Sequence, residues 1–219
     1  MITPRLSRRL LQHHLPIGAA SAFLIVLLYT TRSYPDVLTR LSFATAYPAL
    51  ALLAITLSIG PWKVLRGQQF ASSIDLRRDF GIWAGLIGFT HAAAGQFVHL
   101  RGRPWLYYIY ENWQLKHVQP FRHDVFGLAN DTGLIATLVL LLLLATSNDY
   151  SLRKFRAPGW KRLQRWSYVC FGLTAVHTFA YQLGIKSINL PYVIAAVVAV
   201  VTTVTIQIIA YRRRRASVI

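Results

Sequence analysis

The stretch LRRDFGIWAGLIGFTHAAAG, from Leu76 to Gly95, joins a basic start to a long apolar run that contains a single histidine, His91. A second stretch, WKRLQRWSYVCFGLTAVHTFAYQ from Trp160 to Gln182, has the same layout around His177. In both, the histidine follows the aromatic residue that opens the apolar run by eleven residues. At about 1.5 Å per residue, each imidazole would lie roughly 16 Å along its helix. The two stretches therefore predict a pair of helices with histidines at one depth.

The composition indicates a membrane protein. Of 219 residues, 54 % are hydrophobic and 14 % are charged, whereas about a quarter of the residues of a soluble domain are charged. An excess of 24 basic over 7 acidic residues also occurs in nucleic-acid-binding proteins, but those carry basic patches on a soluble fold. Here the charges separate apolar runs, so we expect a lipid bilayer and no nucleic acid as the partner. The single cysteine, Cys170, excludes an internal disulfide and is expected to be buried.

Six apolar segments approach the length of about 20 residues that a helix needs to cross a bilayer core of roughly 30 Å. A helix is expected for each of them, because lipid offers the backbone no hydrogen bonds. The fold class is therefore an all-α membrane protein, a bundle of six transmembrane helices in one domain over residues 1–219 without a nucleotide-binding domain. The expected spans are Leu15–Thr31, Phe43–Trp62, Phe80–His99, Gly127–Thr146, Trp166–Gly184 and Pro191–Tyr211.

The distribution of basic residues predicts the orientation, because lysine and arginine accumulate on the cytoplasmic side. Seventeen of the 24 fall in the N-terminal segment, the second and fourth loops and the tail. Both termini should then be cytoplasmic, with an uncleaved first helix. We expect a multi-pass protein of the bacterial inner membrane.

The connection from Leu100 to Phe126 should face the outside. Its run WLYYIYENW, from Trp105 to Trp113, is aromatic and amphipathic, which is typical of the membrane interface. We expect an interfacial helix that seals the bundle. The alternative is a docking surface or lid for an external electron partner.

An imidazole within a membrane span is costly without a partner and therefore indicates function. Only His91 and His177 lie well inside the expected spans. Two neutral imidazoles from different helices at one depth are what ligation of a haem iron by two histidines requires. Small residues beside both, such as Gly85, Gly88 and Gly172, would let the macrocycle approach the backbone. The alternative is that each histidine only forms hydrogen bonds between helices.

Other residues have weaker signals. His99, Arg101 and Arg103 could contact the haem propionates, or simply extend to the interface. A rival function is a haem-free transporter or proton-path subunit that uses His91, His177 and Asp131. Asp131 is more simply expected in an Asn-Asp-Thr cap at the start of the fourth helix. An assembly or anchoring subunit is a third possibility.

The basic Arg-Arg-x-x-Gly entry to the third helix, followed by His91, and the run WxxLQRxSY followed by His177 resemble the ferric reductase-like transmembrane domain superfamily. This superfamily includes the NADPH oxidases and ferric reductases. The similarity covers roughly helices two to five, and the six-helix plan fits the whole chain. The resemblance implies a b-type cytochrome that carries electrons between a cytoplasmic or quinol donor and an external acceptor.

Members of the superfamily often hold two stacked haems. The resemblance matches His91 and His177 to the outer ligands, whereas Arg78 and Gln164 stand where inner ligands would be expected, thirteen residues before each. We therefore expect one haem b. The resemblance also suggests a flavin or quinone at the cytoplasmic face, where Arg78 is a candidate contact; the alternative is that Arg78 only follows the positive-inside distribution. Without a nicotinamide domain, the chain would be a transmembrane oxidoreductase subunit that depends on a separate reductase or quinone donor.

Overall fold

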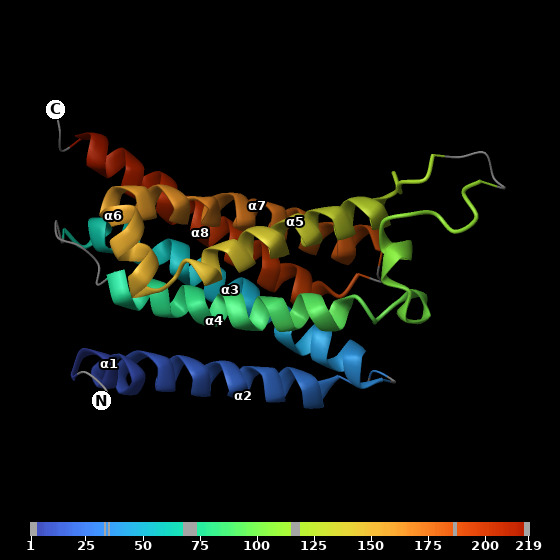
Figure 1. Ribbon diagram of the computed structural model, residues 1–219, viewed down its shortest axis with the longest axis horizontal. Coiled ribbons are helices and arrows are strands. Elements are labelled where there is room, and N and C mark those ends of the chain that lie inside the picture. Colours follow the sequence, from blue (N-terminus) through green and yellow to red (C-terminus); the bar gives the residue numbers. More distant parts are fainter. Residues whose placement is uncertain are drawn as a thin grey trace.

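The computed structural model describes residues 4–32, 34, 36–67, 74–114, 119–185 and 188–216, without the side chains of Pro4, Arg5, Ile74 and Arg101. Long helices run roughly along one axis (Figure 1). Beyond them, the β pairing of the described part consists of an isolated bridge between Ile109 and Phe121. The elements are α1 (Pro4–Arg9), the π-helical turn η1 (Leu10–His14), α2 (Leu15–Thr31), α3 (Val37–Leu65), α4 (Ile74–Gly95), the 3-10 turns η2 (Leu100–Gly102) and η3 (Pro104–Tyr107), α5 (Val125–Ala145), α6 (Asp149–Gln164), α7 (Trp166–Phe179), the π-helical turn η4 (Ala180–Ile185) and α8 (Leu190–Ala216).

Both ends of the described chain lie at one end of the bundle, together with α6, and the connection between α4 and α5 lies at the other (Figure 1). This arrangement agrees with an even number of passes along the bundle axis. The side of the membrane on which each end lies stays a prediction.

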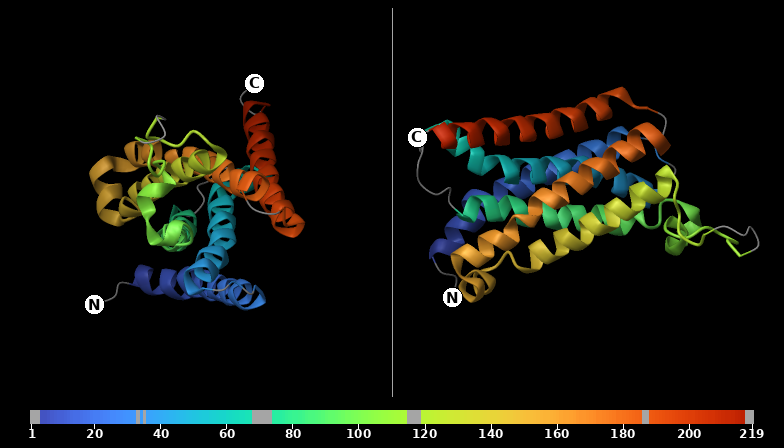
Figure 2. Two further views of the ribbon diagram at one scale, coloured as in Figure 1. Left: turned by 90° about the vertical axis from the view of Figure 1, so that its right-hand side faces the viewer. Right: turned by 90° about the horizontal axis from the view of Figure 1, so that it is seen from above.

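The third helix forms the centre of the bundle. It packs against α2, α4, α7 and α8, and the two views in Figure 2 show it between the N-terminal and C-terminal helices. Asp36 begins it as a cap, because its carboxylate accepts a hydrogen bond of 2.8 Å from the Thr39 amide. Its buried residues include Leu50, Leu53 and Leu57. Apolar contacts with the surrounding helices, rather than polar interactions, hold this helix in position.

The structure confirms helices at all six expected spans, and by length and composition four described helices could cross a membrane: Leu6–Thr31, Val37–Leu65, Val125–Ala145 and Leu190–Ala216. The two histidine-bearing helices do not meet that measure. The first turns of α4 are charged, and α7 has 14 residues before its π-helical turn. Six transmembrane spans therefore remain a proposal.

Three local expectations were wrong. Helix α4 ends at Gly95, so His99 follows the helix instead of lying on it. The interfacial helix expected over 105–113 is limited to the turn η3, from which Tyr107 is buried and donates a hydrogen bond of 2.9 Å to the Gly95 carbonyl. The basic fourth loop is largely the helix α6. The aromatic segment thus seals the bundle through one tyrosine rather than through a helix.

The start of α5 was also misplaced. Asp124, not the Asn-Asp-Thr run, caps this helix by accepting a hydrogen bond of 2.7 Å from the Gly127 amide. Its carboxylate also pairs with Arg122 at 2.6 Å. The Arg122 guanidinium holds the pKa of Asp124 below its usual value. Asp131 therefore lies within the helix, where its residue is exposed.

Candidate functional site

A cavity of about 310 Å³ lies between α3, α4, α5 and α7 and is lined mainly by apolar residues. Its wall includes both His91 of α4 and His177 of α7. One end is bounded by Leu53 and Leu140, and the other reaches His99 and Tyr181 beside the connection between α4 and α5. The expected pair of histidines therefore shares one cavity.

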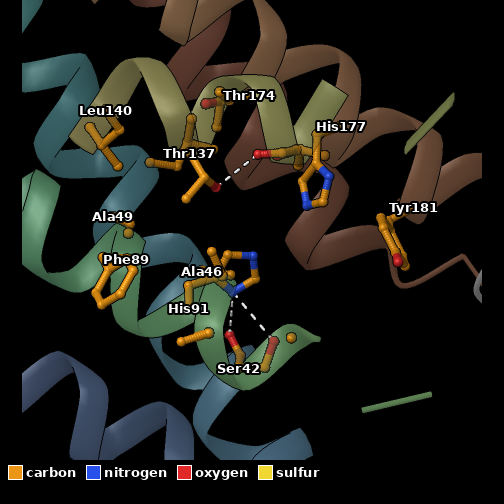
Figure 3. Close-up of a pocket in the computed structure, with 18 of the residues that line it drawn as sticks. Ser42, Ala46, Ala49, Phe89, His91, Thr137, Leu140, Thr174, His177 and Tyr181 are labelled. Carbon is orange, nitrogen blue, oxygen red and sulfur yellow. Dashed lines mark hydrogen bonds between the residues drawn. The ribbon is translucent and has the colours of Figure 1, made fainter. Parts of the chain in front are cut away.

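The two imidazoles approach each other across this cavity (Figure 3). Their ring centres are 6.0 Å apart and their planes are inclined at 77°. A histidine–metal bond measures about 2.0 Å, so one metal ion between two imidazoles would put the ring centres roughly 6 Å apart. The separation of the ring centres therefore matches that expected for a shared metal ion.

The protonation of both rings follows from their neighbours. Nδ1 of His91 lies 2.8 Å from the Ser42 carbonyl oxygen, and Nδ1 of His177 lies 2.7 Å from the Ala129 carbonyl oxygen. A carbonyl oxygen only accepts, so each Nδ1 carries the hydrogen and donates it. In the neutral ring, Nε2 then carries the lone pair. A backbone carbonyl on the second nitrogen is the usual way in which a protein orients a metal-binding histidine.

Two ligands suit a metal whose remaining positions are filled by a macrocycle, as in haem. No group of three or more histidine, cysteine or acidic residues that could hold a metal ion occurs in the described part of the chain. A zinc site normally takes three or four protein ligands. The donor set therefore fits haem better than a bare metal ion.

Glycines leave room at this site, although not all of those expected. A Cβ on Gly133 of α5 would lie 2.5 Å from Nδ1 of His177, so this glycine is required for the ring to reach its carbonyl. Gly88 lines the cavity. By contrast, Gly85 packs against Leu144, and a Cβ on Gly172 would meet no atom within 4 Å. Neither of these two lines the cavity.

Sequence reasoning missed the residues that orient the histidines. Gly133 directly follows the Asn-Asp-Thr run, and no role was expected for it from the sequence. The Ser42 and Ala129 carbonyls belong to α3 and α5, and a backbone acceptor has no signature in a sequence. Only the small size of the residues at these positions was a signal.

The structure places His99 at the outer end of the cavity. Its ring lies parallel to that of Tyr181, with 6.4 Å between the ring centres and 12° between the planes. Arg103 instead pairs with Glu111 at 2.6 Å, and both are well exposed. The side chain of Arg101 lies outside the described residues. Of the two expected propionate contacts whose side chains the structure describes, His99 lines the cavity and Arg103 does not.

The positions expected for inner ligands hold different chemistry. Arg78 is 4 % exposed and forms ion pairs with Asp149 at 2.5 Å and Asp75 at 3.3 Å, joining α4 to α6. Gln164 ends α6. Within the described residues, Arg78 Nε and Gln164 Nε2 are buried without a hydrogen-bond partner. Asp131 does not line the histidine cavity.

Comparison with known proteins identifies the family of the chain. The family model for the ferric reductase like transmembrane component matches residues 15–175. The heme-binding subunit MsrQ of protein-methionine-sulfoxide reductase from Deinococcus radiodurans is 30 % identical over 139 residues, which are 63 % of this chain and 59 % of that protein. The chain is an integral membrane protein, and it belongs to the family of ferric reductase-like transmembrane components.

Proposed function

We propose that this protein is a membrane b-type cytochrome that carries electrons through one haem between a cytoplasmic or quinol donor and an external acceptor. The observation that carries the proposal is the separation of 6.0 Å between the His91 and His177 rings, together with a carbonyl acceptor at each Nδ1. The similarity to a heme-binding subunit supports the same cofactor.

A haem held there would supply one-electron transfer. His91 and His177 would hold the haem through the Nε2 atoms of their neutral imidazoles, and the four helices would supply an apolar wall that lowers the local dielectric constant. Ser42 and Ala129 fix the ring orientations through their carbonyls. His99 and Tyr181 form the outer end of the wall, where polar haem substituents would meet solvent.

We propose one haem rather than two. The ion pairs of Arg78 hold its two Nη atoms to Asp75 and Asp149, and Gln164 has an amide where an imidazole would be needed. The same pairs reduce the charge that Arg78 could offer to a flavin phosphate. We still propose a flavin or quinone at the cytoplasmic face. Arg78 is not proposed as its main contact.

The electron partners follow from the relative and from the charge distribution. The MsrQ relative is named as a subunit of a reductase, so we propose that this chain, too, works with a separate reductase or quinone donor and an external electron acceptor. The proposed location is the bacterial inner membrane with both termini cytoplasmic, as the positive-inside rule predicts. The rival proton path is less favoured, because Asp131 is exposed on α5 and absent from the cavity wall.

An absorption spectrum tests the proposal. The full chain, purified in detergent, is expected to show a Soret band and, after reduction with dithionite, the sharp α and β bands of a low-spin haem. The pyridine haemochrome assay should give close to one haem per chain. A colourless but folded protein would refute the function, and a ratio near two would refute the single site.

Gly133→Ala is expected to lower haem content strongly, because the added Cβ would lie 2.5 Å from Nδ1 of His177 and force the ring off the Ala129 carbonyl. Loss of such an orienting partner commonly weakens metal binding by about 10- to 100-fold. Haem per chain and the dissociation rate to a haem scavenger measure the effect. The matched control is Gly172→Ala on α7, where the Cβ meets nothing within 4 Å. Equal haem retention in the two variants would contradict the assigned geometry.

A further inference from the structure

A second cavity of about 420 Å³ lies between α2, α3 and α4, on the opposite side of α3 from the histidine pair. Its wall is mainly apolar, with Ile17, Leu52 and Phe80 among its residues. Near the cytoplasmic end of the bundle, as we orient it, the wall also includes His13 and Gln12. The cavity is therefore amphipathic: an apolar chamber with one polar end.

The polar end adjoins a buried cluster that the electron-transfer site does not use. Asp79 is fully buried, and its two carboxylate oxygens accept hydrogen bonds from Nε and Nη2 of Arg9. Nδ1 of His13 lies 2.8 Å from Asp79 Oδ2, and Nε2 of His14 lies 3.2 Å from Oδ1. The π-helical turn Leu10–His14 carries both histidines. Such turns inside α-helices are frequent at functional sites.

The contact with Asp79 determines what His13 can do. An ionised carboxylate only accepts hydrogen bonds, so Nδ1 of His13 donates and, in the neutral ring, Nε2 carries the lone pair. A carboxylate behind an imidazole holds the ring in place and fixes which nitrogen carries the hydrogen. This is the arrangement in which histidine accepts a hydrogen bond or a proton from a hydroxyl group. Because His13 also lines the cavity, that hydroxyl would belong to the occupant.

We propose that this cavity binds a membrane-soluble ring that bears a weakly acidic hydroxyl, the chemical class of hydroquinones and hydroxyquinolines, with His13 as the acceptor at the hydroxyl. An apolar body matches the chamber wall. A phosphate group fits less well, because Asp79 already neutralises the Arg9 guanidinium at this end. An acyl chain alone would leave the polar end without a partner.

The position relative to the histidine cavity gives the site a role. Leu52 lines the second cavity, whereas its neighbour Leu53 lines the first, and Phe80 and Ala84 of α4 are divided in the same way. The two chambers thus lie on opposite faces of the α3–α4 pair, at about one helix diameter, roughly 10 Å. A hydroquinone bound there would lie where electrons must enter, and this role, unlike the binding itself, rests on the proposed function.

The test is a binding titration of the full chain in detergent with 2-heptyl-4-hydroxyquinoline N-oxide. Isothermal titration calorimetry measures the binding. We expect saturable binding of one molecule per chain. Ala20→Leu fills the chamber and should weaken binding at least tenfold, because Ala20 lines it. The matched control is Ala19→Leu. Ala19 is exposed, as Ala20 is, but it does not line the cavity. His13→Phe keeps a ring but removes both nitrogens and should also weaken binding at least tenfold.

The outcomes separate the parts of the proposal. Absence of saturable binding, or equal binding by the Ala19→Leu and Ala20→Leu variants, would overturn the site. Retention of full affinity by His13→Phe would overturn recognition of the hydroxyl and leave a chamber for an alkyl chain. Haem content is measured on the same samples, so a colourless chain that still binds the probe would refute the proposed cytochrome function without refuting this site.

Discussion

We expect that replacing either His91 or His177 with alanine abolishes haem binding. The two rings face one cavity with 6.0 Å between their centres, and each would offer one nitrogen to the haem iron. Removal of one imidazole leaves the iron with a single protein ligand and opens space in an apolar wall. The purified variants should lack the α and β bands after reduction, with the haem-to-chain ratio close to zero.

The control for this pair is His123→Ala. His123 is exposed in the connection between α4 and α5 and does not line the cavity, so its removal should leave the spectrum unchanged. His99→Ala provides an intermediate comparison, because His99 lines the outer end of the cavity and stacks on Tyr181. It should retain haem with altered dissociation kinetics. Full haem content in either the His91 or the His177 variant would remove that residue from the ligand set.

The second large effect concerns Asp79, which is fully buried. Its carboxylate contacts the side chains of Arg9, His13 and His14. Asp79→Asn removes the negative charge and leaves the Arg9 guanidinium poorly compensated. Loss of one partner from a buried ion pair typically costs about 3–5 kcal/mol. We expect a lower midpoint of thermal unfolding and faster proteolysis near the N-terminus, because this cluster joins η1 to α4.

The comparison variant is Glu111→Gln, which breaks the pair with Arg103, a pair whose side chains are 39 % and 54 % exposed. Exposed pairs contribute about 0–1 kcal/mol, so this variant should unfold almost as the parent does. Equal destabilisation by the two substitutions would indicate that Asp79 has no special contribution to the anchoring of the N-terminal helix.

The helices and the histidine pair could be predicted from the sequence, because both depend on local pattern. An apolar run of about 20 residues specifies a helix in lipid. Equal spacing from the start of each run then brought His91 and His177 to one depth. The measured contact between their rings confirms that inference.

The Asp79 cluster could not be predicted, because its partners are 65 to 70 residues away in the sequence. His13 and His14 lie just before the first expected span, in the N-terminal segment that was expected to be cytoplasmic. In the structure, one nearly continuous helical stretch, Leu6–Thr31, carries them beside α4. Ion pairs between distant segments leave no periodic signal in either partner.

The outer connection shows how a composition signal can give the wrong local structure. Aromatic residues are typical of an interface whether or not they form a helix. Here Leu100, with φ of 57°, and Gly102, with φ of 70°, turn the chain in left-handed conformations before the aromatic run. The Tyr107 ring is then buried, and its hydroxyl contacts the Gly95 carbonyl and the His99 amide. Tertiary packing, rather than amphipathicity, determines the conformation of this segment.

The carbonyl partners of the two histidines belong to α3 and α5, which themselves carry no ligand. Each imidazole is therefore oriented only when its neighbouring helix has already docked. Cofactor affinity and helix assembly then share one free energy, as in proteins whose metal site exists only in the folded state. During biogenesis, the cofactor would select the chains that have completed their four-helix assembly and retain them in that state.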